Sequence, residues 1–353
     1  MPATLLWRWL AGAALLACLI LAVAASRPSP AIAAMLFFAE VFPLAPVKPL
    51  SAIAPSPDYW QVTFTSVNGP VVGDLFLPGR RLIGPLRRPA VIIGTGVRLD
   101  REQDRAAIRQ LAASLARLGY VALWPRLETI DANAWQFERP ETFVRAFQYL
   151  AARDDVDPER VSLVGISLGA SITLLAAADP AIADRVHAVV FLGGYFDLID
   201  YILALVNEQA VHNSRVIPWR PGDDTRRQAR ELVKAEGVPQ LLPYLEPDVT
   251  LAGRDALLAL LAPDDLARLN RFNPAAHIER VRAPVFILHD RRDEYVPFTE
   301  SEKLAAALPP GTPRSVLISD AFDHVNLGQD LALETVLEYL ALSRFLVDVF
   351  AAL

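Results

Sequence analysis

The chain has 353 residues, of which 53% are hydrophobic, a formal net charge of −6 and a single cysteine, Cys18. One cysteine excludes an intramolecular disulfide, and an acidic balance without a basic block excludes the electrostatic pattern of nucleic-acid-binding proteins. No Cys/His cluster has metal-ligand spacing and no glycine-rich loop has the dinucleotide or Walker pattern, so we expect no metal, no cofactor and no nucleic-acid partner.

The N-terminus is apolar. Arg8 precedes an uncharged run from Leu10 to Ala25, which is about long enough for a signal-peptide core or a short transmembrane helix. We expect an uncleaved membrane anchor, with the rest of the chain on the extracytoplasmic side because Arg8 and the free amine favour a cytoplasmic N-terminus. Cleavage at Ala22-Val23-Ala24, lipidation of Cys18 and a buried helix of a soluble protein are the alternatives. A second apolar stretch, Ala31–Ala45, is too short to span a bilayer and either lies at its interface or covers the domain.

Apolar segments with strand character follow along the chain. The first two flank Asn68-Gly69-Pro70 and read as a hairpin. The later ones are short, apolar on both faces and separated mostly by helical patterns, of which Arg101–Leu118 is the clearest. A hairpin followed by strand–helix alternation predicts a mostly parallel central sheet with helices on both faces, an α/β fold. The predicted strands are Gln61–Val67, Val71–Leu77, Pro89–Gly94, Val121–Trp124, Val161–Ile166, His187–Leu192, Pro284–His289 and Ser315–Ser319.

The most informative segment is Gly165-Ile166-Ser167-Leu168-Gly169. It follows a β-branched strand pattern and precedes an Ala-rich helical pattern, Ala170–Ala178. A G-x-S-x-G turn between a strand and a helix predicts a nucleophile elbow, in which the serine has a strained backbone and the glycines allow close approach of neighbouring chain. The serine hydroxyl then stands at a helix N-terminus, which favours a developing negative charge.

A serine nucleophile needs a base, which is itself oriented by an acid. The chain has 5 histidines. In proteins with this elbow the order along the chain is Ser, acid, His, and only His324 follows the last predicted strand. We therefore predict His324 as the base, and we interpret His187, His212 and His277 as surface or packing residues.

The acid is expected at the end of the strand Pro284–His289. The segment from His289 to Pro297 resembles the H-G-x-x-D-x-x-V-P loop of α/β-hydrolases, especially their dienelactone hydrolase and prolyl oligopeptidase branches. The resemblance covers roughly residues 58–342 and implies the α/β-hydrolase fold. Matched position by position, it implies that Asp293 is the triad acid. Asp290 stands where the family usually has glycine and is the alternative.

Asp323 is a third candidate acid, but it adjoins His324, and adjacent side chains on a loop rarely face each other well enough to pair. An oxyanion hole in this fold is made by two backbone N–H groups. One is expected from Leu168, and the other from the loop Gly94-Thr95-Gly96-Val97, where the family commonly has His-Gly. Gly96 is favoured over Val97 as this donor, and a plain glycine-rich turn is the other interpretation.

An insertion at about residues 195–274 interrupts the alternation of strands and helices. It contains amphipathic helical runs broken by prolines, and we expect a helical lid over the carboxyl ends of the strands, where ligands bind in open α/β sheets. The predicted helical runs are Leu198–Val206, Arg226–Lys234 and Asp255–Leu269. The aromatic residues that either line an acyl or alcohol pocket or pack the lid onto the body are Tyr195, Phe196, Tyr201 and Trp219.

The chain therefore divides into three parts. Residues 1–57 hold the anchor or leader and an apolar linker, residues 58–342 form the α/β-hydrolase domain with its lid, and residues 343–353 end a C-terminal helix. The resemblance and the triad predict a serine hydrolase, a carboxylesterase acting on a small-molecule ester or other acyl substrate. A peptidase or an acyltransferase uses the same residues, and a non-catalytic, membrane-tethered binding module is the alternative outside enzymes.

Overall fold

The computed structural model describes residues 28–41, 47–67, 69–79, 87–95, 102–126, 139–235, 238–246, 249–320, 322–323, 326–327 and 333–353. The expected anchor, Cys18, Gly96, Val97 and His324 lie outside these residues. Within these ranges, none of the helices combines the length and the apolar character that crossing a membrane requires.

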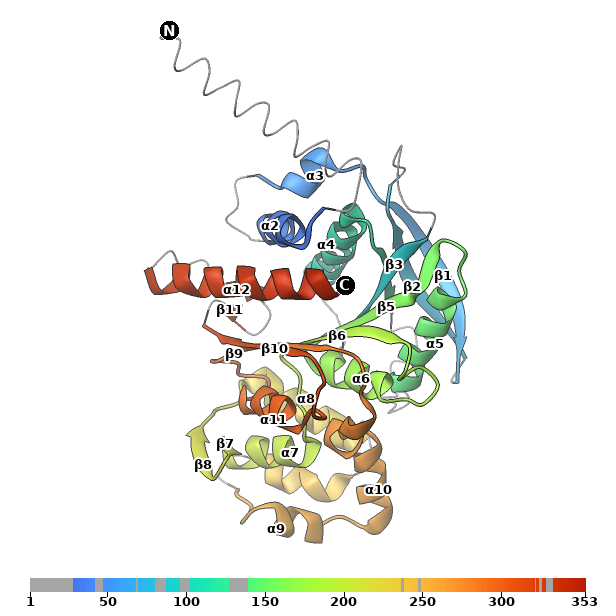
Figure 1. The fold of residues 1–353 in the computed structure, drawn as a ribbon. Coiled ribbons are helices and arrows are strands. Elements are labelled where there is room, and N and C mark those ends of the chain that lie inside the picture. Colours follow the sequence, from blue (N-terminus) through green and yellow to red (C-terminus); the bar gives the residue numbers. More distant parts are fainter. Residues whose placement is uncertain are drawn as a thin grey trace, which may run out of the picture.

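An eight-stranded sheet forms the centre of the protein, with the strand order β1-β2-β4-β3-β5-β6-β9-β10 (Figure 1). β1 pairs with β2 and β2 with β4 in antiparallel register, whereas all other neighbours are parallel. The mostly parallel sheet and the opening hairpin are thus confirmed. The strands are β1 (Asp58–Ser66), β2 (Gly69–Leu77), β3 (Arg88–Thr95), β4 (Val121–Pro125), β5 (Val156–Ile166), β6 (Val186–Leu192), β9 (Val285–Asp290) and β10 (Arg314–Ser319).

Helices cover both faces of the sheet, as predicted. Two consecutive residues of β3 show why its sequence is apolar throughout. Ile92 packs into the core on one face of the sheet, and Ile93 packs into the core on the other face. The first core is covered by α5 (Arg139–Ala151), α6 (Leu168–Ala177) and α11 (Thr299–Ala307), and the second by α2 (Pro30–Val41), α4 (Glu102–Leu118) and α12 (Leu333–Ala352) (Figure 1).

The apolar stretch Ala31–Ala45 covers the domain over its described part. Its helix α2 packs against α12 and α4, and Leu36 is buried there. The short helix α3 (Pro49–Ile53) follows, with Leu50 fully buried. Buried Glu40 joins the two helices, because one of its carboxylate oxygens accepts the N–H of Leu50 at 2.9 Å and that of Ser51 at 3.2 Å. These helices are therefore part of the folded body.

The insertion forms a separate, mainly helical layer (Figure 1). Two features differ from the prediction. The run Asp255–Leu269 is two helices, because Pro263 lacks an N–H and begins the second one. A two-stranded hairpin was also missed; Asn213 and Ser214 form its turn with φ of 48° and 60°, values typical of two-residue hairpin turns. The insertion comprises α7 (Leu198–Asn207), β7 (Gln209–His212), β8 (Arg215–Pro218), α8 (Asp223–Ala235), η2 (Pro239–Leu245), α9 (Arg254–Ala259), α10 (Pro263–Arg271) and η3 (Pro274–Ala276).

The remaining short elements lie around the last strands. η4 (Ile278–Arg280) leads from the insertion to β9, and the two-residue strands β11 (Phe322–Asp323) and β12 (Asn326–Leu327) pair with each other beyond β10.

Candidate active site

Ser167 lies at a sharp turn between β5, which ends at Ile166, and α6, which begins at Leu168. Its φ of 56° and ψ of −135° are strained for a residue with a side chain. The turn is held on both sides, since Ser167 N–H donates to the carbonyl of Leu192 at 2.7 Å and its own carbonyl accepts the N–H of Ala170 at 2.8 Å. The strand–turn–helix geometry of the elbow is present as the sequence indicated.

The glycines of the elbow are required by close packing. A Cβ on Gly169 would overlap the backbone of Gly94 and Thr95, so the end of β3 lies directly against the elbow. The N–H of Leu168 is at the first position of α6, where a helix offers no internal acceptor. Gly96 lies outside the described residues.

Both candidate acids are buried: Asp290, the last residue of β9, is 0% exposed, and Asp293, in the loop that follows, is 1% exposed. Asp290 Oδ1 accepts the N–H of Arg292 at 2.9 Å, which closes a local turn. Asp293 Oδ1 accepts two backbone N–H groups, those of Tyr295 at 2.7 Å and Val296 at 3.0 Å. Two converging N–H groups fix the orientation of the Asp293 carboxylate, and one N–H group holds that of Asp290.

His289 supports the loop that follows β9, residues 291–297, which carries Asp293 and which we call the acid loop. The sequence analysis missed this role. The imidazole is fully buried, with Nε2 3.0 Å from the carbonyl of Val296 and Nδ1 2.7 Å from the hydroxyl of Ser301. Because a carbonyl only accepts, Nε2 carries the proton in the neutral ring and Nδ1 accepts from the hydroxyl. Nε2 also lies 3.4 Å from Asp293 Oδ2. The signal was the histidine that begins the resembling loop.

The register of the parallel strands places the elbow and the acid loop. Ile166 of β5 lies beside Leu192 of β6, which lies beside Leu288 of β9. Two strand spacings, roughly 10 Å, therefore separate the end of β5 from the end of β9. This separation leaves room for an imidazole between a serine and a carboxylate.

The loop that carries His324 starts beside the acid loop. Ser319, the last residue of β10, pairs with Asp290, and its carbonyl accepts the N–H of Arg291 at 2.9 Å. The next residue, Asp320, lies 3.2 Å from the guanidinium of Arg291. The base assignment itself stays a prediction. His212 contacts its neighbour Asn213 on the surface, and His277 contacts a carbonyl within the lid, which agrees with structural roles for both.

The lid packs over the elbow and the acid loop. It has its own apolar core, in which Leu168, Tyr295 and Val296 take part together with lid residues. Tyr195 belongs to this core and Tyr201 and Trp219 pack against it, whereas Phe196 belongs to the core of the sheet. These contacts favour the packing interpretation of the lid aromatic residues.

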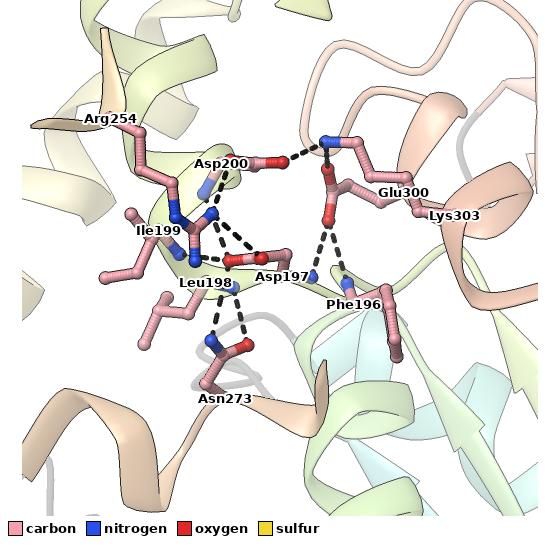
Figure 2. Close-up of polar contacts among 9 residues, drawn as sticks. All are labelled: Phe196, Asp197, Leu198, Ile199, Asp200, Arg254, Asn273, Glu300 and Lys303. Carbon is pink, nitrogen blue, oxygen red and sulfur yellow. Dashed lines mark hydrogen bonds and ion pairs between the residues drawn. The ribbon is translucent and has the colours of Figure 1, made fainter. Parts of the chain in front are cut away.

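A charged network joins the start of the insertion, residues 196–200, which we call the root of the lid, to α11 (Figure 2). Glu300, which is 1% exposed, accepts the backbone N–H groups of Phe196 at 3.0 Å and Asp197 at 2.7 Å, where the chain leaves the sheet. Lys303 Nζ bridges Glu300 at 2.7 Å and Asp200 of the lid helix α7 at 2.9 Å. Burial raises the pKa of Glu300, although Lys303 and the two backbone N–H groups oppose that shift.

The lid side of the network adds a second cation. Arg254 of α9 lies 3.0 Å from Asp197 and 2.7 Å from Asp200 (Figure 2). Asp197 also caps α7 by accepting the N–H of Ile199 at 2.9 Å. Burial by itself lowers the pKa of Lys303, but the attraction of the neighbouring carboxylates outweighs it and leaves that pKa raised. The network thus fastens both α7 and α9 to the body.

The arrangement offers a serine at a helix N-terminus and a buried, oriented carboxylate under an apolar lid. In the part of the chain that the structure describes, no group of three or more His, Cys, Asp or Glu side chains is arranged to hold a metal ion.

No protein-family model matches the sequence, and no curated protein does. The chain is similar to the solved structure of 2,6-dihydroxy-pseudo-oxynicotine hydrolase, with 16% identity and a TM-score of 0.53 over 86% of this chain and 72% of that one. It is similar to an esterase of Pyrobaculum calidifontis, with 16% identity and a TM-score of 0.51 over 90% and 92% of the two chains.

The chain is also similar to dipeptidyl peptidase 4 of Porphyromonas gingivalis, with 12% identity and a TM-score of 0.52. Here 83% of the chain aligns with only 36% of the peptidase, so it spans about a third of that protein. Identities this low establish the fold alone. With the observed strand order, they show that this chain has the α/β-hydrolase fold.

Proposed function

We propose that the protein is a serine hydrolase that cleaves a carboxylic ester through an acyl-enzyme intermediate. The observation that carries the proposal is the strained backbone of Ser167, with φ of 56°, at the N-terminus of α6. Backbone strain at a residue other than glycine clusters at active sites. The esterase, hydrolase and peptidase among the similar structures add support for a hydrolytic reaction.

In the proposed mechanism, Ser167 Oγ attacks the ester carbonyl carbon while His324 takes the hydroxyl proton. The negative carbonyl oxygen is held by the N–H of Leu168 and that of Gly96. His324 then protonates the departing alkoxide, which leaves as an alcohol. Water, deprotonated by the same imidazole, attacks the acyl-enzyme and releases the carboxylic acid and free Ser167. Asp293 keeps the imidazole in the tautomer that accepts the serine proton.

An ester is proposed as substrate because an alkoxide leaves more easily than an amine. A peptidase or an acyltransferase on the same triad is the second candidate, favoured by the peptidase among the similar structures. We also retain the proposal that residues 10–25 attach the protein to a membrane, because the run is uncharged and about long enough to span one.

A fluorophosphonate probe tests the nucleophile. We expect the probe to label the protein at Ser167 and to label the Ser167→Ala variant not at all. Ser343→Ala is the matched control, because this serine lies in α12 and donates only to the carbonyl of Tyr339 one turn earlier. The proposal is overturned if Ser167→Ala is labelled as Ser343→Ala is, or if the wild-type protein is not labelled. p-Nitrophenyl esters of increasing length, beside peptide amides, then separate esterase from peptidase.

A further inference from the structure

The lid donates hydrogen bonds to three consecutive carbonyl groups of the acid loop. The indole N–H of Trp219 donates to the carbonyl of Asp293 at 2.6 Å. The carbonyl of Glu294 accepts two bonds, from the hydroxyl of Thr225 at 3.0 Å and from the backbone N–H of Gly222 at 3.2 Å. The hydroxyl of Tyr201 donates to the carbonyl of Tyr295 at 2.8 Å. All four donors come from the insertion, and every acceptor belongs to the loop that presents the candidate acid. Each contact joins residues that are far apart in the sequence.

Two of these carbonyls, those of Glu294 and Tyr295, each belong to a peptide group whose N–H donates to the Asp293 carboxylate. The carbonyl of Glu294 and the N–H of Tyr295 belong to one peptide unit, and the carbonyl of Tyr295 and the N–H of Val296 belong to the next. Both N–H groups donate to Asp293 Oδ1. In a planar trans peptide the C=O and the N–H point to opposite sides. Each peptide is therefore held by the lid on one side and holds the carboxylate on the other.

This geometry transmits position from the lid to the carboxylate. Rotating either peptide about the chain to satisfy a different acceptor would break the lid bond and the carboxylate bond together. Hydrogen bonds in such a chain also polarise one another, so a donor at the carbonyl strengthens the N–H on the far side of the peptide. The lid donors at the carbonyls of Glu294 and Tyr295 thus set both the direction and the strength of the two bonds to Asp293.

The Tyr201 donor is itself held in place. Its ring stacks on Tyr195 with centroids 5.6 Å apart and planes at 2°, and the indole of Trp219 packs against it at 6.5 Å. Burial raises the pKa of Tyr201, so its hydroxyl stays protonated and remains a donor at every working pH. The Tyr195 hydroxyl, in contrast, donates to the carbonyl of Phe272 within the lid region at 2.9 Å.

We propose that Tyr201 is a positioning residue for the acid, so that docking of the lid on the loop sets the rate of the chemical step as well as covering the site. This rests on the proposed function, in which Asp293 orients the base. A lid that only admits substrate would influence KM, whereas a lid that builds the acid influences kcat.

Two tyrosine variants give a matched test. Tyr201→Phe removes a hydroxyl that donates to the acid loop, and Tyr195→Phe removes one from the same ring stack that donates to the carbonyl of Phe272. We expect Tyr201→Phe to lower kcat for a p-nitrophenyl ester by about tenfold or more with KM within about twofold, and Tyr195→Phe to keep kcat within about twofold. Equal losses for the two tyrosine variants overturn the proposal.

A double-variant cycle separates positioning from general weakening of the fold. In an Asp293→Asn background the lid hydroxyl has no ionised acid to orient, so adding Tyr201→Phe should change kcat by less than about twofold. Fully multiplicative losses would mean that Tyr201 acts elsewhere, and they contradict the proposal.

Hydrogen exchange tests the same bonds without relying on activity. The amides of Tyr295 and Val296 should exchange at least about tenfold faster in Tyr201→Phe than in wild type or Tyr195→Phe, because their peptide groups lose the lid restraint. Unchanged exchange overturns the inference. A wild-type protein that neither hydrolyses esters nor labels at Ser167 contradicts the proposed function instead, and the exchange result then still decides whether the lid orders this loop.

Discussion

Lys303 Nζ lies 2.7 Å from the carboxylate of Glu300, one turn earlier in α11, and Glu300 is 1% exposed. The pair fastens the root of the lid, because the other oxygen of Glu300 holds the backbone where the chain enters the insertion. Lys303 supplies the counter-charge that makes burial of this carboxylate tolerable.

Replacing Lys303 by Met is expected to cost about 2–4 kcal/mol of unfolding free energy, because a buried carboxylate loses its closest cation. Lys303 lowers the pKa of Glu300, so its removal raises that pKa beyond the raised value caused by burial. A carboxyl with a folded pKa above its unfolded value binds more protons when folded, and its native state loses stability as pH rises through that interval. The deficit of the variant should therefore be larger at about pH 8 than at about pH 5.

Arg254→Met is the matched control for urea unfolding at the two pH values. Arg254 contacts Asp197 and Asp200 in the same network, but its side chain is 43% exposed. Exposed ion pairs contribute little, so we expect a loss below about 1 kcal/mol. A deficit in Lys303→Met that is smaller at high pH would show that Glu300 is not the group whose charge is compensated.

The two buried carboxylates Asp290 and Asp293 should differ in catalysis. Asp293→Asn keeps the Oδ1 acceptor for both backbone N–H groups but presents the wrong partner to the base, so we expect kcat to fall by about 10⁴-fold. Asp290→Asn also keeps its acceptor for the turn and should cost far less. Steady-state kinetics of the two variants decides the assignment. Reversed losses would make Asp290 the triad acid.

The activity should fall in acid with the binding of one proton. A histidine base must be neutral to accept the proton of Ser167, and an unperturbed imidazole titrates near pH ~6.5. We therefore expect kcat/KM for an ester to fall on the acid side with the titration of one proton in the region of roughly pH 6 to 7.5, and its logarithm to approach a slope of about one at lower pH. A rate that stays flat down to about pH 5 would exclude a histidine base and with it the role of His324.

The N-terminal helices α2 and α3 are expected to be needed for stability. A chain beginning at Pro28 retains both and should melt within a few degrees of the full-length protein. A chain beginning at Pro55 lacks Leu36 and Leu50, which are 3% and 0% exposed, and each such side chain contributes about 1.5–3 kcal/mol by burial. Thermal melts of the two chains measure the difference. Equal melting temperatures would show that these helices add nothing to the fold.

The same chains test the membrane proposal. The full-length protein should sediment with membranes and resist carbonate extraction, because residues 10–25 are uncharged. The chain beginning at Pro28 should stay in the supernatant with its esterase activity intact. Full-length protein in the soluble fraction with an intact N-terminus would refute the anchor.

The sequence alone predicted the strands and the elbow, because both are determined by residues that are close together in the sequence. Alternating or continuous apolar runs mark strands whatever they pair with, and Gly165 and Gly169 around Ser167 demand a tight turn whose backbone is observed at φ of 56°. The break at Pro263 and the hairpin turn at Asn213 were also local signals, which were overlooked inside a long amphipathic insertion.

Only the tertiary structure decided how the lid meets the acid loop. Tyr201 and Tyr295 are 94 residues apart in the chain, and Phe196 and Glu300 are 104 apart. No periodicity or motif links such positions, because the contacts exist only once the insertion has packed against the acid loop and α11. Tyrosine hydroxyls, backbone carbonyls and glutamates occur in most sequences. Which of them meet is decided by the packing of the whole chain.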